Sequence, residues 1–363
     1  MTTQIPWMPT PDQIFGAWQS AMRKVMATPT VMDTMKRVQV GCTPTRTIHR
    51  EDKMRVLRYE SDVEKRFKTP LLFVFALVNR PYILDLKTGK SVVQHFVNRG
   101  FDVYNLDWGV PADGDRYLAL EDYIQGYMHE TIEKICERTG APHVNLLGYC
   151  MGGTMTAMYT AIRPQRVRNL ISLTAPFDWS QKSSLLDVWC DEKYFDVDKV
   201  IEVYGNAPPH WLQSSFTMLR PVQNLFEKWQ GFYDNMEDEK YLEDFFAMET
   251  WLNDNIPVAG ETFRQFVKYC YQKNLLIQNK FHLGDERVDL KNIVCPMLNL
   301  IASNDHLVPP DHSHPLNEAV GSTDRKTMVF PAGHIGMAVS SRAHRDLWPK
   351  VCDWLEERSE PVG

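Results

Sequence analysis

The stretch that decides the fold is LGYCMGGT at residues 147–154, which joins a short apolar run to a helical stretch. Its G-x-C-x-G spacing is a cysteine variant of the tight turn that holds a nucleophile between a strand and a helix. Gly148 and Gly152 stand where small residues let the neighbouring backbone come close. The helix would point its positive dipole end at the Cys150 sulfur and offer the Met151 N–H to an oxyanion. The pattern therefore predicts a reactive thiol.

Short apolar runs alternate with helical stretches on both sides of this turn, which is typical of a parallel sheet in an α/β domain. We expect strands at residues 70–76, 102–106, 143–147, 170–173, 297–302 and 327–330. We expect helices at residues 91–99, 120–136, 152–162 and 343–357.

Two segments lie outside this alternation. Residues 180–290 lack clear strands and are too long for a loop, so they predict a mainly helical cap over the carboxyl ends of the strands. The amino-terminal segment has apolar residues at helical spacing up to a break at Pro29, then a second short helix at residues 32–38. This helical arm would pack on its own chain or meet another chain. We expect four parts: the arm at 1–40, the core at 41–179 and 291–363, and the cap at 180–290.

A nucleophilic thiol needs a base, and in folds with this turn the chain order is nucleophile, acid, histidine. Asp305 follows the fifth predicted strand, and His334 follows the sixth. The order predicts a Cys150, Asp305 and His334 triad in an α/β-hydrolase fold with a mainly helical cap insertion. Asp178 and Asp311 remain alternatives for the acid.

The loop after the first predicted strand is the usual source of a second oxyanion donor in this fold. The backbone N–H of Val78 or Asn79 is therefore the candidate. A local cluster of His306, His312 and His314 has no cysteine or carboxylate set at metal-ligand spacing. We expect neither a metal nor a cofactor.

The composition is that of a globular protein. With 363 residues, 44% hydrophobic and 24% charged, it excludes disordered, collagen-like and disulfide-scaffold classes. A net charge of -6 with dispersed Lys and Arg argues against a nucleic-acid partner. The 7 cysteines form no CxxC pair and are expected to be reduced. No apolar run approaches the ~20 residues that span a bilayer, and the first residues have no signal-peptide pattern, so we expect a cytoplasmic protein.

A cysteine in place of the usual serine changes the expected substrate. When a thiolate attacks a thioester, one thioester replaces another and the acyl group stays activated for a further acceptor. Acyl transfer is therefore the favoured reaction. A Cys-His-Asp hydrolase, such as a thioesterase or a lactone hydrolase, would hold the same three residues and stays an open alternative.

Seven blocks spread over the chain after about residue 40 form a specific combination. They are LGYCMGGT at 147–154, ALVNRPYILDL at 76–86, GFDVYNLDWG at 100–109, DEKYF at 191–195, NDH at 304–306, GH at 333–334 and DWLEERS at 353–359. In this combination the chain resembles polyhydroxyalkanoate (PHA) synthases, and among them the short class III and class IV catalytic subunits. The two classes share these motifs, so class III and class IV both stay open.

The resemblance implies polymerisation of (R)-3-hydroxyacyl groups, with 3-hydroxybutyryl-CoA as the expected substrate, into a polyester with release of CoA. Cys150 would hold the growing polyester chain and His334 would deprotonate the thiol. Asp305 would support this step or share in activating the 3-hydroxyl of the incoming monomer, and the resemblance favours the second role.

The resemblance also implies partners and a place of work. It implies a second, non-catalytic synthase subunit and activity at the surface of polyester granules, and we expect a homo-oligomer as well. A granule-coating scaffold that kept the fold without the activity is a further alternative. A Cys150 that does not react in thiol alkylation would favour this alternative.

Overall fold

The computed structural model describes residues 11–362, which divide into two compact units. The smaller unit holds the described residues up to Val40 together with Arg220–Asn253. The larger unit holds Gly41–Leu219 and the described residues from Asp254 onward. The sheet and all candidate site residues lie in the larger unit.

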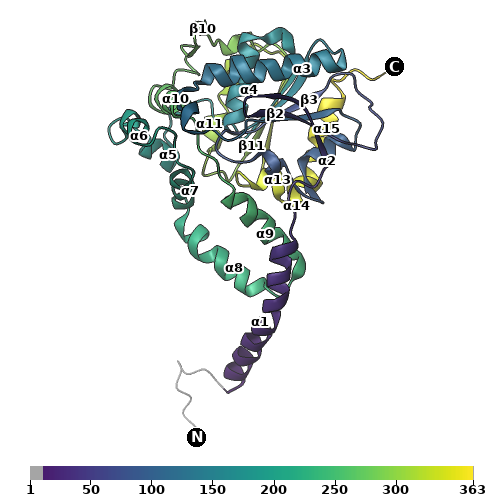
Figure 1. Ribbon diagram of the computed structural model, residues 1–363, viewed down its shortest axis with the longest axis vertical. Coiled ribbons are helices and arrows are strands. Elements are labelled where there is room, and N and C mark those ends of the chain that lie inside the picture. Colours follow the sequence, from purple (N-terminus) through teal and green to yellow (C-terminus); the bar gives the residue numbers. More distant parts are fainter. Residues whose placement is uncertain (1–10, 363) are drawn as a thin grey trace. The chain divides into compact units, whose positions relative to one another are not determined.

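An eight-stranded sheet in the order β1-β2-β6-β3-β7-β8-β11-β12 forms the centre of the larger unit (Figure 1). The strands are β1 (Thr45–Glu51), β2 (Met54–Tyr59), β3 (Leu71–Val74), β6 (Val103–Asp107), β7 (Val144–Tyr149), β8 (Val167–Leu173), β11 (Met297–Ala302) and β12 (Arg325–Phe330). Neighbours from β6 to β12 are parallel. All six predicted strands are confirmed, with end points shifted by a few residues.

Strands β1 and β2 were not predicted from the sequence; β1 pairs antiparallel with β2, and β2 pairs antiparallel with β6. Arginines interrupt the apolar pattern of β2. In the structure the Arg55 Nε donates to Asp107 at 3.0 Å, and the Arg58 Nε donates to Asp102 at 2.7 Å. These carboxylates come from a distant part of the chain, so the local pattern cannot show that the arginines belong to a strand.

Helices cover both faces of the sheet (Figure 1). One face carries α2 (Val92–Val97), α14 (Ser341–Asp346) and α15 (Trp348–Glu356), and the other carries α3 (His129–Thr139) and α4 (Met151–Ile162). A π-helical segment, η3 (Asp122–Met128), leads into α3. The single helix predicted at residues 343–357 is two helices, because Pro349 in the first turn of α15 has no N–H with which to continue the ladder from α14.

Short elements join these parts. They are η1 (Pro81–Leu84), β4 (Asp85–Lys87), β5 (Lys90–Ser91), η2 (Asp113–Tyr117), η4 (Pro164–Arg166), β9 (His282–Leu283), β10 (Glu286–Arg287), η7 (Leu290–Asn292), α11 (Pro310–Ser313), α12 (Leu316–Ala319) and α13 (Gly336–Val339).

Helical segments of the predicted cap lie against loops at the carboxyl ends of strands in the larger unit. They are α5 (Leu185–Trp189), α6 (Val197–Tyr204), α7 (Pro209–Met218), α10 (Gly260–Gln265) and the π-helical η6 (Phe266–Gln272). Asn255, which precedes α10, accepts a hydrogen bond from Asn79, which follows β3, at 2.9 Å. Asn274 donates to Asp178, which follows β8, at 2.7 Å.

The smaller unit is helical. It consists of α1 (Pro11–Arg37), η5 (Gln223–Glu227), α8 (Lys228–Asn235) and α9 (Glu239–Asn253), and α1 packs on α9. The predicted break at Pro29 is wrong, since α1 continues through it. A proline deprives the carbonyl four residues earlier of its donor, and that residue, Val25, is 63% exposed. Water can therefore satisfy the carbonyl without ending the helix.

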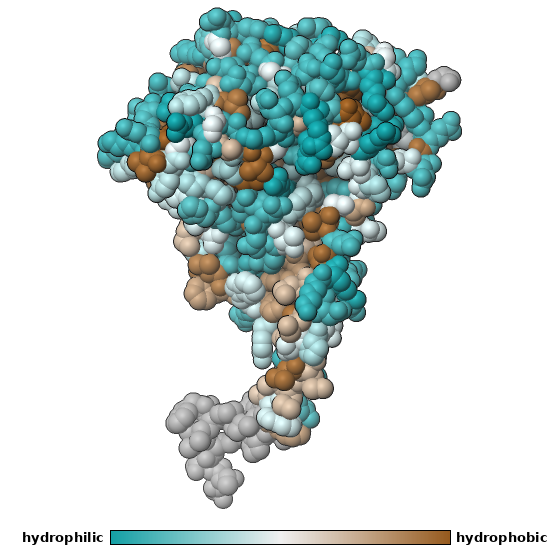
Figure 2. All heavy atoms as spheres, viewed as in Figure 1, coloured by the Kyte–Doolittle hydropathy of each residue, from teal (hydrophilic) through white to brown (hydrophobic). Residues whose placement is uncertain are grey.

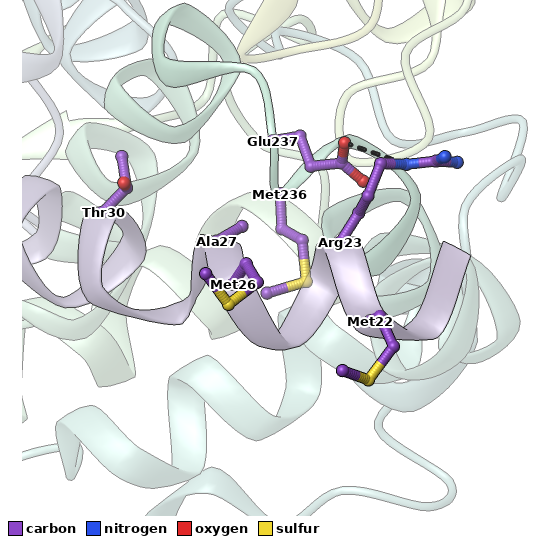
Figure 3. Close-up of a pocket in the computed structure, with 7 residues that line it drawn as sticks. All are labelled: Met22, Arg23, Met26, Ala27, Thr30, Met236 and Glu237. Carbon is purple, nitrogen blue, oxygen red and sulfur yellow. Dashed lines mark ion pairs between the residues drawn. The ribbon is translucent and has the colours of Figure 1, made fainter. Parts of the chain in front are cut away.

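Among the described side chains of α1, the two buried ones, Lys24 and Thr34, are polar, whereas many of the exposed ones are large and apolar. Buried Lys24 donates to the Asp234 carbonyl oxygen at 2.7 Å. The exposed set is Phe15, Trp18, Met22, Val25, Met26, Met32 and Met35, and Figure 2 shows tan and brown atoms over this helix. A hollow of about 440 Å³ is lined by Met22, Arg23, Met26, Ala27, Thr30, Met236 and Glu237 (Figure 3).

Candidate active site

Cys150 stands on the turn between β7 and α4 in a backbone conformation that side chains rarely adopt, with φ 56° and ψ -129°. The flanking glycines are required by contact. A Cβ on Gly148 would lie 2.5 Å from the Cα of Gly153, and one on Gly152 would lie 2.3 Å from the carbonyl oxygen of Val74. The geometry predicted for this turn is therefore present.

The Gly152→Ala variant is expected to lose at least about 2 kcal/mol of unfolding free energy, because the new methyl group meets the backbone of β3. Urea unfolding followed by circular dichroism measures the change. Gly126→Ala is the matched control, since its Cβ meets nothing within 4 Å in η3 and should leave stability unchanged or raise it by up to about 1 kcal/mol. Equal changes in unfolding free energy for the two variants would contradict the tight contact between Gly152 and the backbone of β3.

Asp305 and His334 are joined by a hydrogen bond between the loops after β11 and β12. The His334 Nδ1 lies 2.6 Å from Asp305 Oδ2. The other carboxylate oxygen accepts from the backbone N–H groups of Leu307 and Val308, both at 2.9 Å. The Asp305 side chain is fully buried. One oxygen thus faces the imidazole while the other is fixed by its own loop.

Cys150 interacts with the same imidazole. Burial lowers the pKa of His334, but charge interactions and hydrogen bonds with Asp305 and Cys150 outweigh it and raise the pKa to about 10. The charged imidazolium of His334 is therefore favoured at neutral pH beside Cys150. The structure brings together the three residues of the predicted triad.

Replacing His334 by Gln should remove a pH-dependent part of the stability. The pKa of His334 is raised from 6.5 to about 10 on folding, so its contribution is complete below about pH 6.5 and is lost as the pH rises toward 10. Between these limits the wild-type unfolding free energy should fall by at least about 1 kcal/mol more than that of His334→Gln. Urea unfolding at several pH values tests this, and parallel curves for the two proteins would argue against the charged pair.

The two alternative acids have other partners. Asp178 accepts a hydrogen bond from Asn274 at 2.7 Å, and Asp311 accepts one from Ser183 at 2.8 Å. Within the described part of the chain, neither is bonded to His334. The geometry therefore favours Asp305 as the acid.

The three clustered histidines differ in burial. His306 and His314 are exposed, while His312 is buried with its Nε2 at 3.1 Å from Asp187 Oδ2. Among residues 11–362, no group of three or more His, Cys, Asp or Glu side chains is placed to hold a metal ion.

The candidate oxyanion donors come from two elements. Met151 is the first residue of α4, so its N–H stands at the helix N-terminus. Val78 and Asn79 lie in the loop after β3, where the Asn79 side chain accepts from the Arg80 N–H at 2.6 Å and donates to Asn255 at 2.9 Å. The loop is thus held in place, and both Val78 and Asn79 remain candidates.

Two tyrosines near the site were given no role from the sequence. The Tyr149 hydroxyl donates to the His334 carbonyl oxygen at 3.0 Å. Burial raises the pKa of Tyr271, and interactions with Cys190, Asp187 and Cys150 add to this. The contact of Tyr149 with His334 forms only through the fold, because the two residues are 185 positions apart, and Tyr271 likewise lies far from Cys150 in the sequence. No local sequence signal could have found them.

The other six cysteines have raised pKa values. All seven are free thiols. Chiefly through burial, the pKa is raised to about 11 for Cys42 and Cys136, to about 12 for Cys190, Cys295 and Cys352, and further for Cys270. These six side chains are therefore held as neutral thiols.

The sheet order, the strained turn and the His334–Asp305 contact define an α/β hydrolase, and a family model described as the alpha/beta hydrolase fold matches residues 81–340. A structure described as the non-heme bromoperoxidase BpoC of Mycobacterium tuberculosis H37Rv has a TM-score of 0.55 at 12% identity, covering 87% of this chain and 100% of its own. The thioesterase domain from the curacin biosynthetic pathway has a TM-score of 0.50 at 12% identity, covering 87% and 99%. These structures show the fold alone, and the predicted fold class is confirmed.

Sequence relatives narrow the family. The chain is 43% identical to the poly(3-hydroxyalkanoate) polymerase subunit PhaC of Haloferax mediterranei, over 94% of this chain and 70% of that one. The PhaC subunits of Synechocystis and Allochromatium vinosum are 42% and 39% identical, over 88% of this chain and 86% and 90% of theirs. A model of the poly-beta-hydroxybutyrate polymerase N-terminus matches residues 22–96. The chain belongs to the PhaC family of poly(3-hydroxyalkanoate) polymerase subunits, which confirms the resemblance.

Proposed function

We propose that this chain is the catalytic subunit of a PHA synthase of class III or class IV that polymerises (R)-3-hydroxyacyl-CoA, with 3-hydroxybutyryl-CoA as the expected substrate. The observation that carries the proposal is Cys150 on its strained turn in contact with the His334–Asp305 pair, in a chain 39–43% identical to polymerase subunits. The substrate is itself a CoA thioester, and we expect no separate cofactor.

In the first step the Cys150 thiolate attacks the thioester carbonyl carbon of the monomer. The N–H groups of Met151 and of Val78 or Asn79 would stabilise the oxyanion. The bond from the acyl carbon to the CoA sulfur breaks as the bond to Cys150 remains. The His334 imidazolium gives its proton to the CoA thiolate, which leaves as free CoA.

In the second step the 3-hydroxyl of a further monomer attacks the Cys150 thioester. Neutral His334 takes the hydroxyl proton, an ester bond forms, and Cys150 leaves as the thiolate. The chain, now one unit longer, is a CoA thioester that Cys150 attacks in turn. Asp305, bonded to the Nδ1 of His334, stabilises each imidazolium.

The alternative is a Cys-His-Asp hydrolase in which water replaces the monomer hydroxyl. Incubation of the purified chain with 3-hydroxybutyryl-CoA separates the two reactions. A synthase yields insoluble polyester with one CoA released for each unit incorporated. Free 3-hydroxybutyrate formed in step with CoA release would overturn the proposal. If the chain releases no CoA at all, the inactive scaffold would be favoured.

We further propose that a second, non-catalytic subunit joins this chain, that the chain forms a homo-oligomer, and that the enzyme works in the cytoplasm at polyester granules. In support, the relatives above are named as subunits of a polymerase. Within residues 11–362, no helix has the length and apolar character to cross a membrane. Co-expression with the candidate subunit, followed by size-exclusion chromatography and an activity assay, tests the association.

A further inference from the structure

Tyr149, the residue before Cys150, contacts His334 in two ways. Its hydroxyl donates to the His334 carbonyl oxygen at 3.0 Å. Its ring lies against the imidazole, with centroids 5.2 Å apart and planes at 27°. The side chain is 1% exposed. The neighbour of the nucleophile therefore holds both the backbone and the ring of the base.

The Tyr149 hydroxyl donates to the His334 carbonyl oxygen, which receives no hydrogen bond from the helix that follows. In a continuous helix the Ala338 N–H would bond to the carbonyl of His334. Here that N–H donates to Ile335 at 2.9 Å, because α13 begins only at Gly336. Burial raises the pKa of Tyr149 well above its usual value, with Cys150 and Asp305 adding to the effect. The phenol thus stays protonated and remains a donor.

Tyr149 is itself fixed to the sheet. It is the last residue of β7, which pairs with β3 on one side and β8 on the other. The ring of Phe75 packs edge-on against it, with centroids 5.2 Å apart and planes at 72°. The loop of His334 is only half-buried. The tyrosine therefore joins a less buried loop to the centre of the sheet.

We propose that Tyr149 is a positioning residue that keeps the His334 imidazole facing Cys150 after the thiol has been acylated. The inference rests on the roles proposed above for Cys150 and His334. Before acylation, the interaction with Cys150 raises the pKa of His334 and helps to hold its imidazole. Acylation of the sulfur removes that interaction, whereas the hydrogen bond and ring contact of Tyr149 do not depend on it. Asp305 and Tyr149 then hold the imidazole while it takes the proton of the incoming hydroxyl.

The signature is a split between the two steps. Tyr149→Phe keeps the ring and loses the hydroxyl. In this variant the rate of the single-turnover CoA burst should change by less than about twofold. Steady-state chain growth per active site should fall roughly five- to tenfold, the effect of one lost hydrogen bond, with KM unchanged. Tyr149→Leu, which also loses the ring contact, should fall about tenfold further, so that the conservative variant restores part of the rate.

Tyr159→Phe is the matched control. Tyr159 is fully buried in α4, and its hydroxyl lies 3.0 Å from the Nδ1 of His129. The Tyr159→Phe variant thus also loses a buried tyrosine hydroxyl, but one that contacts a histidine outside the site. Burst amplitude counts the folded, active molecules in every preparation, so a less stable variant still gives a rate per site. We expect the burst and growth rates of Tyr159→Phe to match those of the wild type.

Tyr149→Phe rates equal to those of Tyr159→Phe would overturn the inference. Equal losses in the burst rate and the growth rate would also overturn it, because the tyrosine would then act before acylation.

A third variant tests the base itself. If His334→Gln leaves the rate of Cys150 alkylation by iodoacetamide unchanged, the proposed base is wrong. If alkylation slows while Tyr149→Phe matches the control, only the positioning role fails.

Discussion

Cys150→Ala should lower CoA release from 3-hydroxybutyryl-CoA by at least about 10⁴-fold and abolish polymer formation. The covalent intermediate needs a nucleophile on the strained turn, and alanine leaves none there. The other six cysteines cannot replace it, because burial raises the pKa of each. Cys150→Ser should retain trace activity at most, since an alkoxide is harder to form than a thiolate.

CoA release measured with a thiol reagent, together with polymer mass, checks this result. Cys295→Ala is the matched control, since it removes a thiol whose pKa burial raises to about 12 and should keep near wild-type rates. Circular dichroism verifies that both variants fold. Normal CoA release by Cys150→Ala would place the nucleophile outside the turn.

Asp305→Asn should slow both the first CoA release and chain growth by roughly 100-fold or more. The Asp305 carboxylate raises the pKa of His334, so its loss lowers that pKa and leaves less charged imidazolium beside Cys150 at neutral pH. The geometry also leaves the carboxylate no free oxygen, because Oδ2 meets the imidazole and Oδ1 meets two backbone N–H groups. We therefore expect Asp305 to act through His334.

A single-turnover burst of CoA compared with steady-state polymer formation distinguishes the possible roles. A normal burst with stalled growth would show that Asp305 acts on the monomer hydroxyl, the role that the resemblance favours. Normal values for both would remove Asp305 from the site and direct attention to Asp178. The His334→Gln variant provides the reference for complete loss of the base.

The parts of the fold that the sequence predicted depend on local patterns. Buried parallel strands appear as short apolar runs, and the turn at Cys150 requires glycines because a Cβ there would meet backbone within 2.5 Å. Asp305 and His334 could be placed because each follows such a run. Chain order and strand ends together thus bring the candidate residues to one edge of the sheet.

The parts that escaped prediction depend on contacts between distant residues. The arginines of β2 become compatible with a strand only when Asp102 and Asp107 pair with them. Pro29 stays within α1 because its surroundings are exposed. Tyr149 stood in the deciding stretch, but its contact with His334 depends on a loop that lies 185 positions later in the chain. Such contacts leave no periodic trace in the sequence.

The contrast among the seven thiols has a practical consequence for quantifying the product. A mild alkylating reagent at neutral pH meets one thiol beside a charged imidazole and six that burial keeps protonated. Label incorporated per mole of protein would then report the fraction of molecules competent to initiate a polymer. This fraction times the moles of protein gives the number of competent molecules, and the polyester mass divided by that number is the mass made per competent molecule. Comparison with the number-average molar mass of the polymer then tells how many polymer chains each molecule has completed.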